Sequence, residues 1–372
     1  MTSATSPSTL SLPHRPEGEL ILGCICPGQP QASKQRILEA LDSSPDWRYV
    51  LEASEKHRVT PLVYRSLRAL GFPQTPEMIQ KELRRRFYRN AQNNLQLTQE
   101  LVALDRQFKH RQIPMLPYKG VILSSMVYGA ISLRQVWDLD ILVHPQTVEK
   151  TQALLTLEGF ELVQEFDREQ TYRHSARPVE VDLHWGLTPA FFPVDISFDT
   201  FWQERQPVEV NNSQLSSFSK TDLLLILCLQ IAKDCWERQQ RIEHLAKVCD
   251  LAALIETSPE LDWQSIVGRS QQMGTYKITA FAINLARVLF NLKLSQQARS
   301  AFPRNKAIDR LIATVCRDLF SDRDRHRSDP DTSYLDFSTR TRQLSFYWQL
   351  RERPRDKVQH TWEILKTLTT GL

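Results

Sequence analysis

Two acidic residues, separated by a single position, lie in a segment that is otherwise apolar. Asp138 and Asp140 begin the sequence Asp-Leu-Asp-Ile-Leu-Val, which predicts a short buried strand that ends before Pro145. Because side chains alternate along a strand, both carboxylates are expected on the same face. Two adjacent carboxylates repel each other unless a cation neutralises them. The pair therefore predicts a site for a divalent cation that prefers oxygen ligands, Mg²⁺ or Mn²⁺.

A third carboxylate is expected from an alternating segment further along the chain. Two such segments before residue 186 predict a β-hairpin, and in the second one Glu180, Asp182 and His184 share a face. If this strand lies beside the first, Asp182 completes a group of three carboxylates; Glu180 is the competing candidate, but it can instead pair with Arg173 or Arg177 across the hairpin. His184 is either a secondary group of the site or a strand-end histidine bonded to the backbone.

Candidate phosphate ligands precede the acidic pair. Gly120 begins a predicted apolar helix, and the N–H groups at a helix N-terminus attract phosphate, to which glycine permits close approach. Lys119 and Arg134 can add positive charge at the same phosphates, although Arg134 is equally well explained as the ion-pair partner of a nearby carboxylate. Three carboxylates beside such a helix suit a two-metal site, in which one ion holds a triphosphate and the other activates a hydroxyl group.

This block of residues resembles the nucleotidyltransferase fold of the polymerase-β superfamily. More narrowly, it resembles that superfamily's uncharacterised nucleotidyltransferase family. The residues that carry the resemblance are Lys119-Gly120, Tyr128-Gly129, Arg134, Asp138-x-Asp140 and Asp182-Leu-His-Trp185. The resemblance implies that a nucleoside monophosphate is transferred from a Mg²⁺-bound nucleoside triphosphate such as ATP to a hydroxyl group on a small molecule, a protein or RNA. In that reaction Asp138, Asp140 and Asp182 would be the catalytic metal ligands.

One motif position differs from the wider superfamily, where the helix opens with Gly-Ser and the serine binds the triphosphate. This chain has Lys119-Gly120 there, and the next serine is Ser124. The difference supports an alternative, a catalytically degenerate nucleotide-binding or protein-interaction module of the same fold. A third hypothesis, an RNA-modifying enzyme, rests on a basic face of a long predicted helix, although a solvated helix face is the commoner explanation. That face comprises Lys81, Arg84, Arg85, Arg86 and Arg89.

Composition narrows the function classes further. The 372 residues include 47 basic and 43 acidic ones, and a net charge of +4 is too small for a dedicated nucleic-acid binder, so DNA is not expected as a partner. The longest apolar run, Leu223 to Leu229, is far shorter than the roughly 20 residues that span a membrane. The N-terminus lacks the pattern of a secretory signal, and the 6 cysteines form no Cys-x-x-Cys pair. These features predict a reduced, cytoplasmic protein.

The elements that must position the candidate residues are mostly helical. The expected fold class is α+β and helix-rich, with a small mixed β-sheet nucleotidyltransferase core flanked by helical regions. The expected divisions are a mostly flexible tail at 1–33, an N-terminal helical region at 34–112, the α/β core at 113–210, a helical domain at 211–320, a charged linker at 321–335 and a C-terminal helical segment at 336–372.

A group of basic residues in the predicted helical domain follows its most apolar helix. These residues either line an acceptor cleft or are ordinary surface charges, and the second explanation is the commoner one. They are Lys233, Arg238, Arg241 and Lys247.

Overall fold

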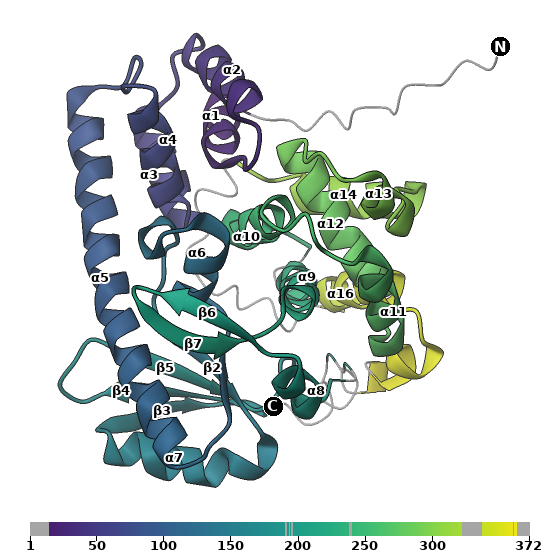
Figure 1. The fold of residues 1–372 in the computed structure, drawn as a ribbon. Coiled ribbons are helices and arrows are strands. Elements are labelled where there is room, and N and C mark those ends of the chain that lie inside the picture. The colour runs from purple at the N-terminus through teal and green to yellow at the C-terminus, as the bar shows by residue number, and fades with distance from the viewer. Residues whose placement is uncertain are drawn as a thin grey trace.

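The computed structural model describes residues 15–321 apart from 190, 191, 193, 195, 238 and 239, and residues 337–362 apart from 360. Helices predominate and flank a small five-stranded sheet (Figure 1), so the predicted α+β, helix-rich class is confirmed. Within the described part of the chain, no helix combines the length and apolarity needed to cross a membrane.

The central sheet is mixed and has five strands in the order β1-β2-β5-β4-β3. The β2 and β5 strands run parallel, and the other neighbours are antiparallel. The strands are β1 (Met115–Pro117), β2 (Leu139–Val143), β3 (Phe160–Glu165), β4 (Glu169–His174) and β5 (Glu180–His184). The predicted hairpin is therefore β4–β5.

The two faces of the sheet differ because its strands alternate. Ile141 of β2 and Val181 and Leu183 of β5 are fully buried and share a hydrophobic cluster with the long helix α5 (Glu77–His110). The intervening residues of both strands point to the opposite face, where the acidic side chains lie. Apolar packing against α5 thus decides which face of the sheet is left for polar groups.

Short helices and turns connect the strands. The helix α6 (Gly120–Tyr128) follows β1, and Gly129 ends it in the left-handed conformation. The short 3₁₀ helix η1 (Ile131–Leu133) precedes β2, while η2 (Pro145–Thr147) and α7 (Val148–Leu157) lead from β2 to β3. The connection from α6 to β2 therefore delivers Arg134 and Asp138 to the same end of the sheet.

The N-terminal region differs from the expectation of a mostly flexible tail over residues 1–33. Helix α1 (Pro16–Ile25) forms inside that range, and its Leu20, Ile21 and Leu22 side chains are fully buried. The apolar run of α1 packs against α2 (Pro30–Leu41) and α4 (Thr60–Ala69), and α3 (Trp47–Lys56) completes this layer. Tertiary burial therefore orders a segment whose Ser- and Pro-rich beginning suggested a loose tail.

A second, two-stranded sheet was not predicted. Strands β6 (Gln206–Val210) and β7 (Ser213–Ser217) form a hairpin around Asn211 and Asn212, both with positive φ. Two adjacent residues at positive φ are typical of a type I′ turn, in which asparagine is favoured. The predicted boundary at residue 210 consequently divides this hairpin, although the Asn-Asn pair was a usable sequence signal.

Most of the remaining helices form the centre and right of Figure 1, where α9 and α10 pack against each other and α10 contacts α6, while α8 lies lower, beside the strands. The predicted charged linker at 321–335 lies outside the described residues except for Ser321. The helices are α8 (Phe198–Gln203), α9 (Lys220–Glu237), α10 (Leu245–Glu256), α11 (Trp263–Met273), α12 (Tyr276–Phe290), α13 (Gln296–Ala301), α14 (Lys306–Cys316) and α16 (Phe337–Leu350).

Candidate active site

Three potential metal ligands meet on the polar face of the β2–β5 pair. The parallel register places Asp140 directly opposite Asp182, and His184 lies two residues further along β5 on the same face. One ligand atom from each of these three side chains lies within 4.8 Å of the others. Carboxylate oxygens at this spacing suit Mg²⁺ or Mn²⁺, and Mn²⁺ also accepts imidazole nitrogen.

The competing carboxylate, Glu180, is engaged elsewhere. Its Oε1 atom lies 2.6 Å from a guanidinium nitrogen of Arg173 on β4, which is the cross-hairpin ion pair considered from the sequence. Asp182 instead accepts a hydrogen bond of 2.7 Å from the Thr171 hydroxyl and leaves its side chain beside Asp140. Burial raises the pKa of Asp182, and the negative charge of Asp140 raises it further.

Asp138 precedes β2 by one residue and is half-buried. Its oxygens are not part of the three-residue group, but the residue lies close enough to sense both other carboxylates. Burial raises the pKa of Asp138 to about 7, with further contributions from Asp140 and Asp182. A carboxyl with this pKa binds a proton readily at neutral pH and releases it when a cation approaches.

Lys119 contacts Asp140 at the centre of the site. Its Nζ atom lies 2.8 Å from Asp140 Oδ1 and 4.9 Å from the centre of the Tyr118 ring. Burial alone opposes the ionisation of Asp140, but Lys119 and His184 outweigh it and lower the pKa of that carboxyl. Burial also opposes the charge on Lys119, yet Asp140 leaves the pKa of the lysine raised. Both members of this pair are therefore charged.

His184 bridges two carboxylates. Its Nε2 atom lies 3.3 Å from Asp140 Oδ1, and its Nδ1 atom lies 3.4 Å from Glu169 Oε2. The side chain does not take the backbone hydrogen bond that was the simpler explanation. Glu169 was missed by the sequence reasoning, although the hairpin register, which pairs it with His184, could have identified it.

Arg134 forms an ion pair with the helical region. Its Nε atom lies 2.9 Å from Asp250 Oδ2, and the Tyr128 hydroxyl donates a 2.9 Å hydrogen bond to the other oxygen of Asp250. Asp250 is fully buried in α10, and Asn94 of α5 donates a hydrogen bond to the Arg134 carbonyl. The structure thus contains the ion pair considered for Arg134, with a partner 116 positions away, and phosphate binding by this residue stays a prediction.

Gly120 occupies the start of α6 in a conformation that requires glycine. Its φ is +54°, and a Cβ atom there would lie 3.2 Å from Val136 Cγ1 and 3.5 Å from the carbonyl oxygen of Asp138. An L-residue in this region is strained as well as crowded. The glycine therefore allows the beginning of α6 to lie against the segment that leads into β2.

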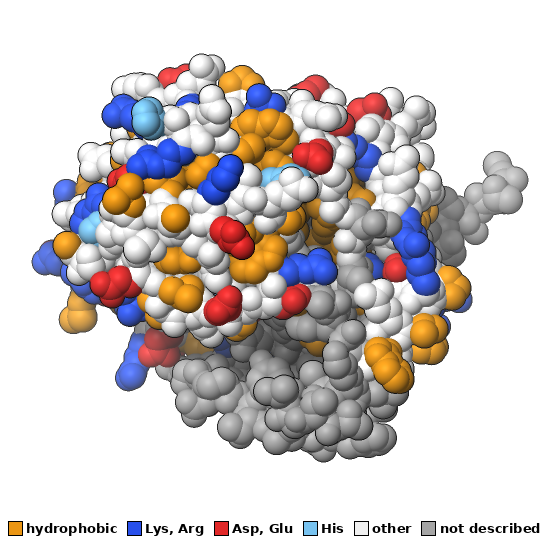
Figure 2. Space-filling view, turned by 90° about the horizontal axis from the view of Figure 1, so that it is seen from below, with side chains coloured by type: hydrophobic (Ala, Val, Ile, Leu, Met, Phe, Trp, Pro, Cys, Tyr) orange, Lys and Arg blue, Asp and Glu red, His pale blue; other side chains and the backbone are white. Residues whose placement is uncertain are grey.

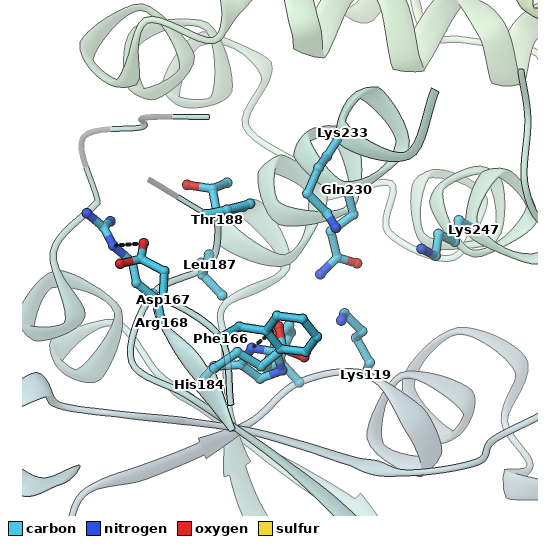
Figure 3. Close-up of a pocket in the computed structure, with 14 residues that line it drawn as sticks. Lys119, Phe166, Asp167, Arg168, His184, Leu187, Thr188, Gln230, Lys233 and Lys247 are labelled. Carbon is cyan, nitrogen blue, oxygen red and sulfur yellow. Dashed lines mark ion pairs between the residues drawn. The ribbon is translucent and has the colours of Figure 1, made fainter. Parts of the chain in front are cut away.

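A pocket of about 420 Å³ opens between the sheet and the helical region. Lys119, Glu169 and His184 line it from the sheet side, whereas Lys233 of α9 and Lys247 of α10 line the opposite wall (Figure 3). Lys247 also contacts the buried Asp234. Two of the four predicted basic residues thus face the pocket; Arg241 pairs with Asp318 at 2.9 Å, and Arg238 lies outside the described residues.

The basic face of α5 is largely neutralised by its own helix. Lys81 pairs with Glu77, and Arg85 and Arg86 both pair with Glu82, each at 2.7 Å. On the described part of the face seen in Figure 2, acidic and basic side chains are interspersed, and no large area of one sign appears. The ion pairs within the helix favour a solvated helix face over an RNA-binding surface.

Comparisons with known proteins agree with the sequence motif. A family model described as "Uncharacterised nucleotidyltransferase" matches residues 43–291, which include the whole three-residue group and the pocket. Among curated proteins, none matches the chain significantly.

Three solved structures are similar to parts of the chain. The lincosamide antibiotic adenylyltransferase LnuA, bound to lincomycin, is 17% identical with a TM-score of 0.27, and the match covers 34% of this chain and 83% of that one. An antigenic nucleotidyltransferase-like protein from Paracoccidioides brasiliensis is 16% identical with a TM-score of 0.34, and the match covers 56% of this chain and 97% of that one. The antibiotic-resistance factor ANT(2'')-Ia is 11% identical with a TM-score of 0.32, and the match covers 47% of this chain and 94% of that one. At these TM-scores the likeness carries no argument about substrates or residues.

Proposed function

Because the chain belongs to the uncharacterised nucleotidyltransferase family, we propose that it transfers a nucleoside monophosphate from a metal-bound nucleoside triphosphate to a hydroxyl group. The observation that carries this proposal is the group formed by Asp140, Asp182 and His184, whose ligand atoms lie within 4.8 Å of one another and of which His184 lines the pocket. Family membership supports nucleotidyl transfer in general, and this group supports a metal-dependent form of it.

The residues present fit a divalent cation. Asp140 and Asp182 would hold it with carboxylate oxygens, and Asp138 is close enough to join them once its proton is released. When bound, the cation would stabilise the charge that develops on the α-phosphate and make the acceptor hydroxyl more acidic. Mg²⁺ and Mn²⁺ are the candidates, because both prefer oxygen ligands.

The transfer requires one bond to form and one to break. The acceptor oxygen attacks the α-phosphorus in line, the bond from that phosphorus to the oxygen bridging the α- and β-phosphates breaks, and pyrophosphate leaves with the electron pair. Asp182 would accept the hydroxyl proton, because its carboxylate lies beside Asp140 in the group that would hold the cation. The acceptor is a small molecule, a protein or RNA.

The triphosphate would lie against the opposite wall of the pocket. Lys119 and Arg134 were predicted to hold it with Gly120, but the two cations are engaged by Asp140 and Asp250. Lys233 and Lys247 face the same pocket from α9 and α10. Both lysines also contact Asp234, so the assignment rests on their place in the pocket lining: we assign them contacts with the phosphates, with Gly120 and Lys119 at the α-phosphate end.

The alternative function is a degenerate module that binds a nucleotide without turnover. The observation that favours it is the Lys119–Asp140 contact of 2.8 Å, at the motif position where the wider superfamily has Gly-Ser. Such a module would be stabilised by a nucleotide and Mg²⁺ but would release no pyrophosphate with any acceptor.

The first experiment is a thermal-shift series with ATP, GTP, CTP and UTP, each with Mg²⁺ and with EDTA. A ligand that binds only the folded state at about 100 times its Kd adds roughly 2.7 kcal/mol to the free energy of unfolding. We expect one nucleotide to raise the melting temperature only with Mg²⁺. Pyrophosphate release in the presence of acceptor mixtures then separates the enzyme from the module.

Matched variants locate the effect. Asp182→Asn is expected to abolish the Mg²⁺-dependent shift, whereas Glu180→Gln, on the same face of β5 but paired with Arg173, leaves it unchanged. Lys233→Met is expected to weaken nucleotide binding, whereas Lys220→Met on the same helix, where Lys220 pairs with Glu260, does not. Equal effects within either pair would contradict the proposed site.

A further inference from the structure

Backbone hydrogen bonds fix the main chain on both sides of Lys119. The Tyr118 N–H donates a 3.3 Å hydrogen bond to the Asp140 carbonyl, and the Leu123 N–H donates one of 3.2 Å to the Lys119 carbonyl. Gly120, with its positive φ, turns the chain between these two bonds. The Cα atom of Lys119 is therefore fixed beside β2, and the side chain alone spans the distance to Asp140.

The position that the ammonium group occupies has the properties of a cation site. The Asp140 Oδ1 atom lies 2.8 Å from Nζ, and the Tyr118 ring lies below the charge at 4.9 Å. The Lys119 side chain is only 19% exposed, and that of Asp140 is 8% exposed. His184 approaches the same oxygen atom of Asp140 at 3.3 Å. Oδ1 of Asp140 is thus already covered by two nitrogen atoms.

We propose that the ammonium group of Lys119 replaces one of the two divalent cations expected for this fold, so that the enzyme works with a single divalent ion held between Asp140 and Asp182. This inference rests on the proposed function, and it corrects the two-metal expectation drawn from the three carboxylates. The replaced ion is the one that would share the Lys119-facing oxygen of Asp140.

The charge balance supports a single ion. The carboxylates of Asp138, Asp140 and Asp182 together carry three negative charges when ionised, and one ammonium group with one divalent ion neutralises them. Before any nucleotide phosphate is bound, a second divalent ion would leave these three carboxylates with an excess of two positive charges, and it would compete with the ammonium group for the same oxygen of Asp140. Repulsion between two cations at one oxygen atom is strong in a partly buried site.

The structure also explains why the motif has lysine before the glycine. The first residue of α6 is Gly120, so Lys119 is the last side chain before the helix that can point back to β2. A serine after the glycine would contact a phosphate, whereas a lysine before it contacts the metal-binding carboxylate. The difference from the wider superfamily thus changes the cation at Asp140 and need not remove activity.

The test counts bound Mn²⁺ ions. The intact chain, Lys119→Met and Lys119→Arg are dialysed against Mn²⁺ with each α,β-methylene nucleoside triphosphate in turn, and bound metal and nucleotide are both measured. Electron paramagnetic resonance then reports whether ions are paired, because two Mn²⁺ ions about 3.5–4 Å apart broaden each other's signal. Circular dichroism verifies that each variant is folded.

We expect the wild-type protein to bind one Mn²⁺ ion with an unbroadened resonance signal. Lys119→Met is expected to bind two Mn²⁺ ions with a broadened signal. Lys119→Arg, which retains the positive charge, is expected to bind one. Two ions in the wild type would overturn the inference while leaving the proposed function intact. One ion in both the wild type and Lys119→Met would also overturn it, because Lys119 would then not exclude the second ion. Neither metal nor nucleotide on the wild type would refute the proposed function itself.

Discussion

The ion pair between Arg134 and Asp250 provides a direct test of why Arg134 is in the motif. Asp250 is 1% exposed in its side chain and Arg134 is 13% exposed, so neither charge can move into solvent without unfolding the region. Replacing Arg134 by methionine leaves the Asp250 carboxylate buried, with the Tyr128 hydroxyl as its one remaining side-chain hydrogen-bond partner among the described residues. A buried charge without its counter-ion is strongly destabilising.

The expected loss of stability is about 3–5 kcal/mol, the range typical when one partner of a buried ion pair is removed. The retained hydrogen bond from Tyr128 places Arg134→Met toward the lower end, near about 3 kcal/mol. The matched control is Arg241→Met. Its pair with Asp318 is more exposed, at 28% and 21%, so the expected loss is less than about 1 kcal/mol.

Urea unfolding of Arg134→Met, Asp250→Asn and the double variant measures the coupling between the two side chains. We expect the double variant to lose about 1–3 kcal/mol less than the sum of the single variants, because removing both charges leaves neither one buried alone. The nucleotide-induced shift in melting temperature, measured on the same proteins, should be retained wherever the protein is folded.

The opposite result would refute this reasoning. If Arg134→Met unfolded at the wild-type urea concentration but lost the nucleotide-induced shift, Arg134 would be a phosphate ligand and its contact with Asp250 would be incidental.

Three further predictions concern the sheet end of the site. Asp140→Asn should abolish turnover and cost about 3 kcal/mol of stability, because it leaves the largely buried Lys119 ammonium without its carboxylate; unchanged urea unfolding would contradict this. Asp138 has a pKa of about 7 in the metal-free folded protein and about 3.9 in the unfolded chain. Between these two values the folded state binds the proton more tightly than the unfolded state does. The contribution of this carboxyl to stability therefore falls as the pH rises from about 4 to 7. Melting temperatures of Asp138→Asn across that range, compared with the wild type, should lack this fall, and parallel curves would rule it out. Gly120→Ala should destabilise the protein by about 1–2 kcal/mol, because φ is +54° and Val136 lies close. Gly268→Ala, in the middle of α11 with open space around it, should stabilise the protein by about 0.5–1 kcal/mol. Urea unfolding that gave both substitutions the same sign would contradict the backbone argument.

Local pattern predicted the framework of the site well. The alternation of β2 and β5 correctly placed Asp140, Asp182 and His184 on one face, because side-chain direction along a strand depends only on neighbouring residues. The long helix over residues 77–110 also followed from local periodicity. The hairpin at β6–β7 was missed, although its Asn-Asn turn is equally local.

The spacing of residues in the sequence could not predict which group each charged side chain pairs with. Whether Arg134 binds a phosphate or a carboxylate depended on Asp250, which is far away in the sequence and arrives only when α10 packs beside α6. Helix α1 is a similar case, because its burial against α2 and α4 orders a segment that looked like a tail.

The sequence by itself determined which residue types meet at the end of the sheet, and through its motif it determined the family. Tertiary structure decided which charges are already neutralised and which face the pocket. Lys119 pairs with Asp140 and Arg134 pairs with Asp250, while Lys233 and Lys247 both contact Asp234 and line the pocket across from Lys119. The physical reason is that an ion pair forms where burial removes water from both partners, and burial is a property of the packed chain rather than of any segment of it.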